Sequence, residues 1–248
     1  MSQPFDDVIC PVKVESNPYP ISNDDFESYL NHDFDLIHST DLWKSYRVNK
    51  QTNDNCYTFI DSKNYDPVWW IKIVGEVDGD INNVDDLLDK SLKKRQPEWH
   101  VLFRGGYSVW KEPNNLYEIC YYRYASTMFG VSPRDTCYMK LRRNLYCDVN
   151  GAIISDNRSV NNNCNSISGD DCSQSDDDQP NKSPSCYFYG FILSYRSIDL
   201  PDLAPVARNY VRTKFSGAHL ITLKDFKNPS MGFVYTYLQH AHPGGNIK

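Results

Sequence analysis

The sequence predicts an α+β fold in which a large, mostly antiparallel curved sheet is accompanied by few helices. Two segments have helical periodicity, and most of the remaining chain consists of short runs rich in Tyr, Phe, Val and Ile. Turn-forming residues separate these runs, which is the pattern of successive strands. The 248 residues, 14% of them aromatic, fit one large β-rich domain or two small ones.

Two helices are expected. The first begins behind Ser22, which can serve as its N-cap, and apolar residues share one of its faces: Phe26, Tyr29, Leu30, Phe34 and Ile37. The second covers "NNVDDLLDKSLKKR", residues 82–95. Its aspartates lie near the beginning and its basic residues near the end, an order that suits the helix dipole.

Strands are expected on both sides of the second helix. They cover residues 43–48, 55–61, 68–77, 107–112, 116–125, 135–147, 185–198, 207–215, 219–225 and 231–241. Between Tyr187 and Tyr195 both faces of the strand are apolar, which is typical of a sheet covered on both sides. A curved sheet of this kind can enclose a cavity for an apolar ligand, although a filled core would have the same pattern.

A polar segment interrupts the strands. Residues 148–185 are rich in Asn, Ser and Asp and predict a disordered insertion on a loop. We divide the chain into an N-terminal extension, residues 1–21, and one domain, residues 22–248, that contains this insertion. The insertion has seven aspartates against Arg158 and Lys182, a net charge of −5, so the rest of the chain carries only −1 of the total of −6.

Charge and hydropathy exclude several classes of protein. A nearly neutral body lacks the basic surface of a nucleic-acid-binding protein. No apolar run approaches the roughly 20 residues that span a bilayer, and the first residues lack the pattern of a secretory signal. The eight cysteines are scattered without a CxxC pair, which predicts reduced thiols in a cytoplasmic protein. Cys120 and Cys137, within apolar strands, are expected in the core.

Two pairs of residues have side chains that can bind a metal. His240 and His242 are two apart, so a strand would point both rings to one face, which can suit zinc or copper. No further ligand has an obvious spacing, and two solvent-facing residues are the simpler interpretation. Cys164 and Cys172 are too far apart for the usual tetrahedral pair. We therefore expect no metal and no cofactor.

Four motifs occur in the order found in the StAR-related lipid-transfer (START) family, and in these motifs the chain resembles members of that family. They are "EWHVLF", "GVSPRDTCYMKLRR", "ARNYVRTKFSGAHLI" and "TYLQHAHPGG", and the resemblance covers residues 41–247, with members that transfer phosphatidylcholine looking most similar. It implies a helix-grip fold, in which an antiparallel sheet curls around a tunnel that holds one lipid. His100 and His242 depart from the family pattern, which usually has an acidic residue or Asn there.

The end of the chain is a further departure. In the family, the residues after Pro-Gly-Gly lead into a long helix that covers the tunnel, whereas this sequence ends three residues after Gly245. The resemblance therefore implies that Pro243–Gly245 forms a turn and that the lid helix is missing. Either the sequence is a truncated product, or the first helix or a protein partner covers the opening.

The resemblance also implies a set of lipid-binding residues. By resemblance, Arg95 lies near the position of an arginine that binds phosphate, and Lys140 lies at the position of a basic residue of the tunnel. Tyr138 lies at the position of an aromatic residue that helps to cage choline. Arg123 lies at another position of that cage, where its positive charge would disfavour choline. The expected set is Arg95, Trp99, Tyr121, Arg123, Tyr138, Lys140, Tyr195, Arg212, Tyr235 and Tyr237. There are simpler alternatives. Arg95 would lie on the surface, Tyr138 and Lys140 would point outward from their strand, and the remaining tyrosines would only pack in the core. The Arg134-Asp135 pair is expected to have a structural role.

The expected function is non-catalytic. We expect a carrier that binds a single lipid, a phospholipid by resemblance, and transfers it between membranes after transient contact with their surfaces. A lipid-sensing or scaffold module that binds lipid and a protein partner without transfer is the alternative. An enzyme on a related scaffold is disfavoured because the sequence has no Ser-His-Asp spacing, metal cluster or phosphate-binding glycine loop.

Overall fold

The computed structural model describes residues 14–52, 54–60, 69–85, 102–126, 131–154 and 186–242. The eleven strands described form one sheet, in which nine follow the order β1-β2-β3-β11-β10-β8-β6-β5-β4 and the short β7 and β9 pair with β6. The strands are β1 (Lys44–Val48), β2 (Asn55–Ile60), β3 (Trp69–Val77), β4 (Phe103–Lys111), β5 (Tyr117–Tyr124), β6 (Arg134–Cys147), β7 (Ile153–Ile154), β8 (Tyr187–Ser197), β9 (Val211–Arg212), β10 (Lys214–Leu223) and β11 (Phe233–His242).

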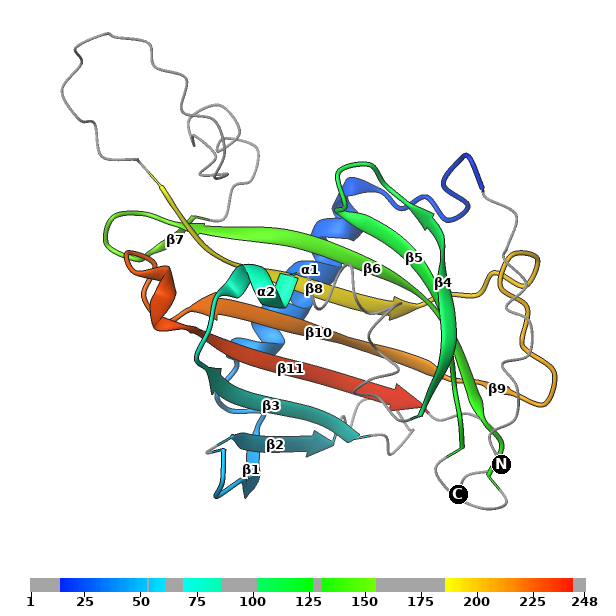
Figure 1. Cartoon of the computed structure of the whole chain (residues 1–248), viewed down its shortest axis with the longest axis horizontal. Helices are drawn as coiled ribbons and strands as arrows, with labels where there is room; N and C mark the ends of the chain where they lie inside the picture. The colour runs from blue at the N-terminus through cyan, green and yellow to red at the C-terminus, as the bar shows by residue number, and fades with distance from the viewer. Residues whose placement is uncertain are drawn as a thin grey trace, which may run out of the picture.

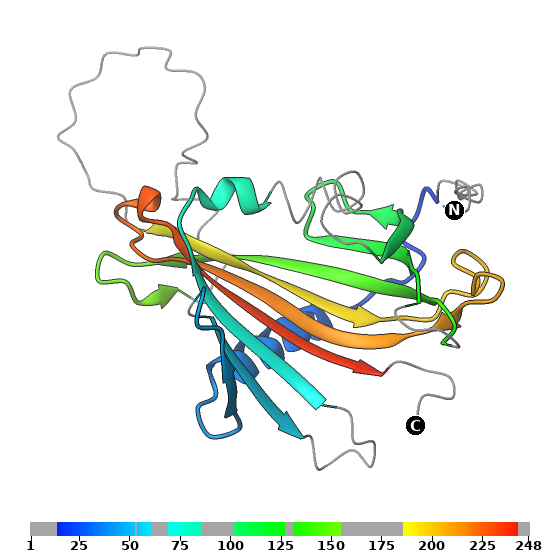
Figure 2. The same cartoon turned by 60° about the horizontal axis from the view of Figure 1, so that its bottom comes forward.

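The sheet is strongly curved, and β4 and β5 curl forward at one edge (Figures 1 and 2). Its long neighbouring strands pair antiparallel, whereas the short β9 pairs with β6 in parallel. The predicted curved antiparallel sheet is therefore confirmed. The tunnel and the absence of a lid helix stay predictions, and residues 243–248 lie outside the described part of the chain.

The first helix, α1 (Asn23–His38), forms as its sequence predicts. Ser22 is the N-cap, and its Oγ accepts a hydrogen bond from the backbone N–H of Asp25 at 3.1 Å. Capping of this kind satisfies a donor that the first turn leaves without a partner. Leu30 and Ile37 are buried against the sheet. Of the predicted second helix, the described residues contain α2 (Ile81–Asp85), and the remainder lies outside them.

The two helices lie on opposite faces of the sheet, α1 behind it and α2 in front in the view of Figure 1. Each face has its own apolar core, so we call them the α1 face and the α2 face. The α1 face buries Leu30 of the helix with Ile119, Leu141, Ile192, Leu220 and Leu238 of the strands. The α2 face buries Ile81 with Cys120, Phe191, Leu193, Ile221 and Phe233. Two cores explain why β8 is apolar on both sides.

Several predicted boundaries require correction. β4 begins at Phe103, before the predicted residue 107, and the predicted strand 207–215 contains only β9 and the start of β10. The predicted insertion begins too early, because β7 pairs with β6 and the carboxylate of Asp148 accepts hydrogen bonds from the backbone N–H groups of Asn150 and Ala152. Residues 155–185 lie outside the described residues.

The cysteines follow the prediction in part. Cys120 and Cys137 are buried, as expected, and burial raises the pKa of the Cys137 thiol to about 12. Cys186, in contrast, is disulfide-bonded, so the expectation of reduced thiols is wrong for this residue. The pattern of cysteines is therefore no support for a cytoplasmic location.

Gly217 marks a close approach between β10 and β11. A Cβ atom built on it would lie 2.1 Å from the carbonyl oxygen of Leu238, closer than atoms can pack. We expect Gly217→Ala to lower the free energy of unfolding by about 2 kcal/mol, because the two strands must move apart. Urea unfolding would measure the loss. The neighbouring substitution Ser216→Ala is the control and should cost under ~0.5 kcal/mol. Equal stability of the two variants would contradict the prediction.

Candidate functional site

A buried ion pair lies on the α2 face between two paired strands. Glu118 of β5 lies opposite Lys140 of β6, and Lys140 Nζ is 2.7 Å from Glu118 Oε2. The side chains are 4% and 2% exposed, and Ser108 Oγ of β4 donates to Glu118 Oε1 at 2.6 Å. Burial of two charges is tolerable because each compensates the other. The pair places two charged groups within a mostly apolar face.

A cluster of aromatic rings lies next to this pair, with Tyr195 opposite Lys140 on the neighbouring strand. Tyr138 lies two residues before Lys140 on the same face of β6, and its ring makes edge contacts with Tyr122, Tyr195 and Phe215 at centroid distances of 5.5, 5.6 and 5.0 Å. Nearby on the same face, the hydroxyl oxygen of Thr136 is buried and has no hydrogen-bond partner among the residues that the structure describes. Such orphaned groups are rare in native proteins. A mostly aromatic surface with a few polar atoms suits an amphipathic ligand.

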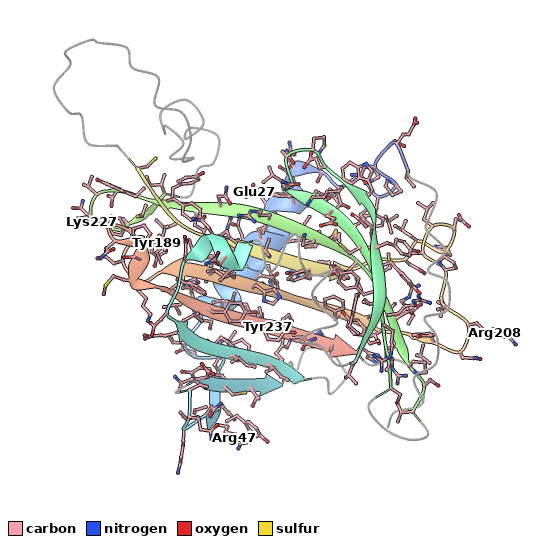
Figure 3. All side chains as sticks on the ribbon, viewed as in Figure 1. Glu27, Arg47, Tyr189, Arg208, Lys227 and Tyr237 are labelled. Atoms are coloured by element: carbon pink, nitrogen blue, oxygen red, sulfur yellow. The ribbon has the colours of Figure 1, made fainter. Side chains whose placement is uncertain are left out.

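A second polar group lies further along the α2 face. His219 of β10 pairs with Tyr237 of β11, and the two rings stack with centroids 4.9 Å apart. The imidazole Nδ1 is 2.5 Å from the hydroxyl oxygen of Tyr235, and the ring of Tyr195 meets the imidazole edge-on. Figure 3 labels Tyr237 in the middle of the sheet. Three of the predicted tyrosines therefore surround a histidine that the prediction did not include.

Burial sets the protonation state of these groups. It lowers the pKa of His219 to about 3, with a further contribution from the positive charge of Lys140. It raises the pKa of Tyr237 to about 12 and the pKa of Tyr235 above its ordinary value. At neutral pH the imidazole is uncharged and both phenols keep their protons, so the group acts through hydrogen bonds rather than charge.

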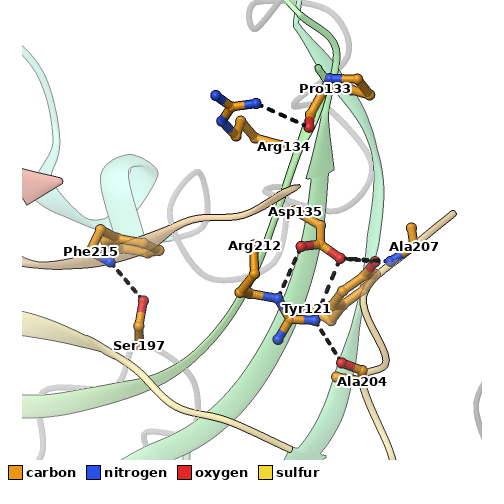
Figure 4. Close-up of polar contacts among 9 residues, drawn as sticks. All are labelled: Tyr121, Pro133, Arg134, Asp135, Ser197, Ala204, Ala207, Arg212 and Phe215. Carbon is orange, nitrogen blue, oxygen red and sulfur yellow. Dashed lines mark hydrogen bonds and ion pairs between the residues drawn. The ribbon is translucent and has the colours of Figure 1, made fainter. Parts of the chain in front are cut away.

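Three predicted residues lie on the α1 face instead. Tyr121 donates its hydroxyl to Asp135 at 2.9 Å, and Arg212 binds the same carboxylate through Nε at 2.9 Å (Figure 4). Arg123 pairs with Asp135 across β5 and β6, so its side chain belongs to the same face. The structure does not bring these three residues together with Tyr138 and Lys140. We leave them out of the candidate site.

The remaining expected residues fall into two groups, and two further residues were not expected. Arg95 and Trp99 lie outside the described residues. Tyr138, Lys140, Tyr195, Tyr235 and Tyr237 all lie on the α2 face, where Lys140 pairs with Tyr195 and Tyr237 pairs with His219. Glu118 and His219 were missed. Each is a polar residue within an apolar run, "LYEICYY" and "GAHLITL", and such a residue in a buried strand needs a partner, which was the available signal.

The histidine pair of β11 does not assemble a metal site among the described residues. His240 stacks on Trp70 with centroids 4.7 Å apart, and His242 is exposed at the end of the strand. In the described ranges, no group of three or more His, Cys, Asp or Glu side chains is placed to hold a metal ion. None of the helices described is long and apolar enough to cross a membrane.

Comparison with known families gives one match. The model of the START domain matches residues 26–168, which is more than half of the chain. This range begins within α1 and includes the ion pair and Tyr138. No curated protein matches the chain.

Solved structures share the fold at low sequence identity. The human StAR-related lipid transfer protein 5 has a TM-score of 0.61 and 13% identity, over 91% of this chain and 84% of that chain. A STAR-related lipid transfer protein from Xanthomonas axonopodis has a TM-score of 0.54 and 14% identity, over 84% and 86%. The lipid transfer and protein localization domain of human StarD13 has a TM-score of 0.53 and 12% identity, over 87% and 82%.

Proposed function

Because the chain belongs to the START domain family, we propose that it binds a single lipid on its α2 face and transfers it between membranes without catalysis. The observation that carries this proposal is the composition of that face. Aromatic rings and aliphatic side chains cover most of it, and its polar groups include the buried pair Glu118–Lys140 and the group around His219. Apolar surface holds acyl chains at about 0.8 kcal/mol for each buried CH₂, and polar groups fix the head.

We propose five of the predicted residues as ligand contacts: Tyr138, Lys140, Tyr195, Tyr235 and Tyr237. The finer proposal is a phospholipid, supported by the ring cluster around Tyr138, since aromatic faces attract a quaternary ammonium by roughly 0.5–2 kcal/mol per ring. The negative charge of Glu118 compensates the positive charge of Lys140. A lipid phosphate would therefore interact with the dipole of the ion pair rather than with an isolated cation. Transient contact with a membrane surface and a cytoplasmic location belong to the same proposal.

Retention and transfer of lipid test the proposal. Native mass spectrometry of the purified chain should show one bound lipid, and fluorescent phospholipid should move between vesicles faster when the protein is present. Filling the α2 face with Ile73→Trp should reduce both signals severalfold, because Ile73 lies opposite Tyr237 on that face. Val74→Trp, one residue along β3 and directed to the α1 face, is the matched control.

The outcomes separate the alternatives. Bound lipid without transfer would favour a sensing or scaffold module that works with a protein partner. Equal effects of the two tryptophan substitutions would place the lipid elsewhere. Absence of any bound lipid, and of transfer from vesicles of mixed composition, would refute the proposed function.

A further inference from the structure

His219 and Tyr235 form a hydrogen-bonded pair on the α2 face that is distinct from the Glu118–Lys140 ion pair. The two residues lie on neighbouring strands, β10 and β11, with imidazole Nδ1 2.5 Å from the phenol oxygen. Tyr237 stacks on one side of the imidazole, and Tyr195 approaches it edge-on at 5.1 Å. The ring is therefore held in one orientation by three neighbours. It remains partly exposed on the face to which the proposed lipid binds.

The pair has two possible arrangements of its protons. In the first, the Tyr235 hydroxyl donates to Nδ1, and the imidazole proton is on Nε2. In the second, Nδ1–H donates to the tyrosine oxygen, and the hydroxyl proton has no acceptor among the described residues. The first arrangement satisfies the hydroxyl, and stranded donors are costly in a partly desolvated place. We therefore assign the proton to Nε2.

This assignment leaves one donor directed away from Tyr235. Within the described part of the chain, Nε2 of His219 makes no hydrogen bond. The imidazole is neutral at pH 7, since burial and Lys140 both disfavour its charged form. A neutral N–H on an aromatic, partly desolvated face suits an uncharged acceptor. A phosphate oxygen would instead gain more from a cation, and a hydroxyl group would bring a donor that needs its own acceptor.

We infer that Nε2–H of His219 donates to a carbonyl oxygen of an acyl lipid, which makes His219 a residue that selects lipids with ester or amide carbonyls over lipids without them. Carbonyl oxygens accept and never donate, so they match a site that offers a donor alone. This inference rests on the proposed function. The inference goes beyond that function because it names the chemical group of the lipid that is recognised and the protein atom that recognises this group.

Two phospholipids that differ only in their carbonyls test the inference. Dioleoyl phosphatidylcholine and its dialkyl ether analogue have the same head group and chain length, and only the first has carbonyl oxygens. Competition between them in mixed vesicles should show a preference of the wild-type protein for the diacyl lipid of about fivefold, the size of one hydrogen bond. His219→Phe keeps the stacking ring and should abolish the preference. His219→Gln places an amide N–H near Nε2 and should retain part of it.

Each outcome of the lipid competition either supports or overturns the inference. A diacyl preference that survives in His219→Phe, or equal binding of both lipids by the wild-type protein, would overturn the inference while leaving lipid transfer intact. Binding of a sterol but of neither phosphatidylcholine would also overturn it. Failure to bind any lipid would refute the proposed function itself. Thermal unfolding of both variants shows whether the fold survives the substitution.

The protonation of the ring gives a test that needs no mutation at His219. ¹⁵N NMR of labelled protein should show Nε2 protonated and Nδ1 not, and the Nε2–H signal should shift when dioleoyl phosphatidylcholine binds. Tyr235→Phe removes the donor to Nδ1 and should make the two tautomers more equal. A wild-type ring protonated on Nδ1 would overturn the inference even if the variants at position 219 did not fold.

Discussion

Asp135→Ala is expected to lower the free energy of unfolding by about 3–5 kcal/mol, because it removes one partner of a buried charge network. The carboxylate is fully buried and is bound by Arg212 Nε, by the hydroxyl of Tyr121 and by the backbone N–H of Ala207, each at 2.9 Å (Figure 4). These partners come from β5, β9 and the loop before β9. Without the carboxylate, the mostly buried guanidinium of Arg212 loses this ion pair. Urea unfolding measures the loss.

Two further variants show where that loss comes from. Asp202→Ala changes an exposed aspartate of the preceding loop and should alter stability by under ~0.5 kcal/mol. Arg212→Met combined with Asp135→Ala should cost less than the sum of the single substitutions, since neither partner is then left alone. A loss below ~1 kcal/mol for Asp135→Ala, or strict additivity, would show that the network does not stabilise the fold.

The same cluster illustrates what could be predicted about Ser132–Asp135. The sequence indicated a structural role for the Arg134-Asp135 pair, and the geometry agrees with it: Arg134 donates to the carbonyl oxygens of Ser132 and Pro133, at 2.5 and 3.5 Å, and Asp135 binds β9. The pairing of Arg212 with this carboxylate places its side chain on the α1 face, away from Tyr138 and Lys140, and its predicted role as a lipid ligand stays a prediction. A salt bridge between residues 77 positions apart has no local signal in the sequence.

The sequence predicted the helices and strands better than it predicted which face of the sheet each side chain occupies. Helical spacing and the Ser22 cap predicted α1, and alternation on β6 correctly placed Thr136, Tyr138, Lys140 and Arg142 together, because side chains alternate strictly along a strand. Which face meets α1 could not be predicted, since both faces of the central strands are apolar. Tyr121 faces α1, and its neighbour Tyr122 faces α2. Arg123 lies two residues after Tyr121 and therefore shares its face. An error of one residue between the two tyrosines thus also assigns Arg123 to the other face.

Boundaries failed for a different reason. The segment from Asp148 has the composition of a disordered loop, yet its first residues close a turn through the Asp148 carboxylate and add β7 to the edge of β6. Composition averages over the whole segment and does not detect one capping side chain. Likewise β9 was merged with β10, because a two-residue strand has too short a pattern to be separated.

Breaking the ion pair of the α2 face should affect stability and lipid binding in different ways. Glu118→Gln keeps the shape but leaves Lys140 buried beside a neutral amide, and we expect a loss of about 3 kcal/mol in the free energy of unfolding. Lys140→Met removes the cation that faces the buried carboxylate, to which the hydroxyl of Ser108 also donates, and we expect a similar loss. Urea unfolding of both single variants measures these effects.

The double variant Glu118→Leu/Lys140→Met separates packing from recognition. Both charges are then replaced by apolar groups of similar volume, which is often neutral or stabilising for a buried pair, so stability should return to within ~1 kcal/mol of the wild type. If the pair orients the polar end of a lipid, retention and transfer should still fall at least fivefold, because one or more charge-assisted hydrogen bonds are lost. Full transfer by a stable double variant would show that the pair is only a structural element of the sheet. Low stability of the double variant would show that the surrounding shell, including Ser108, depends on the charges themselves.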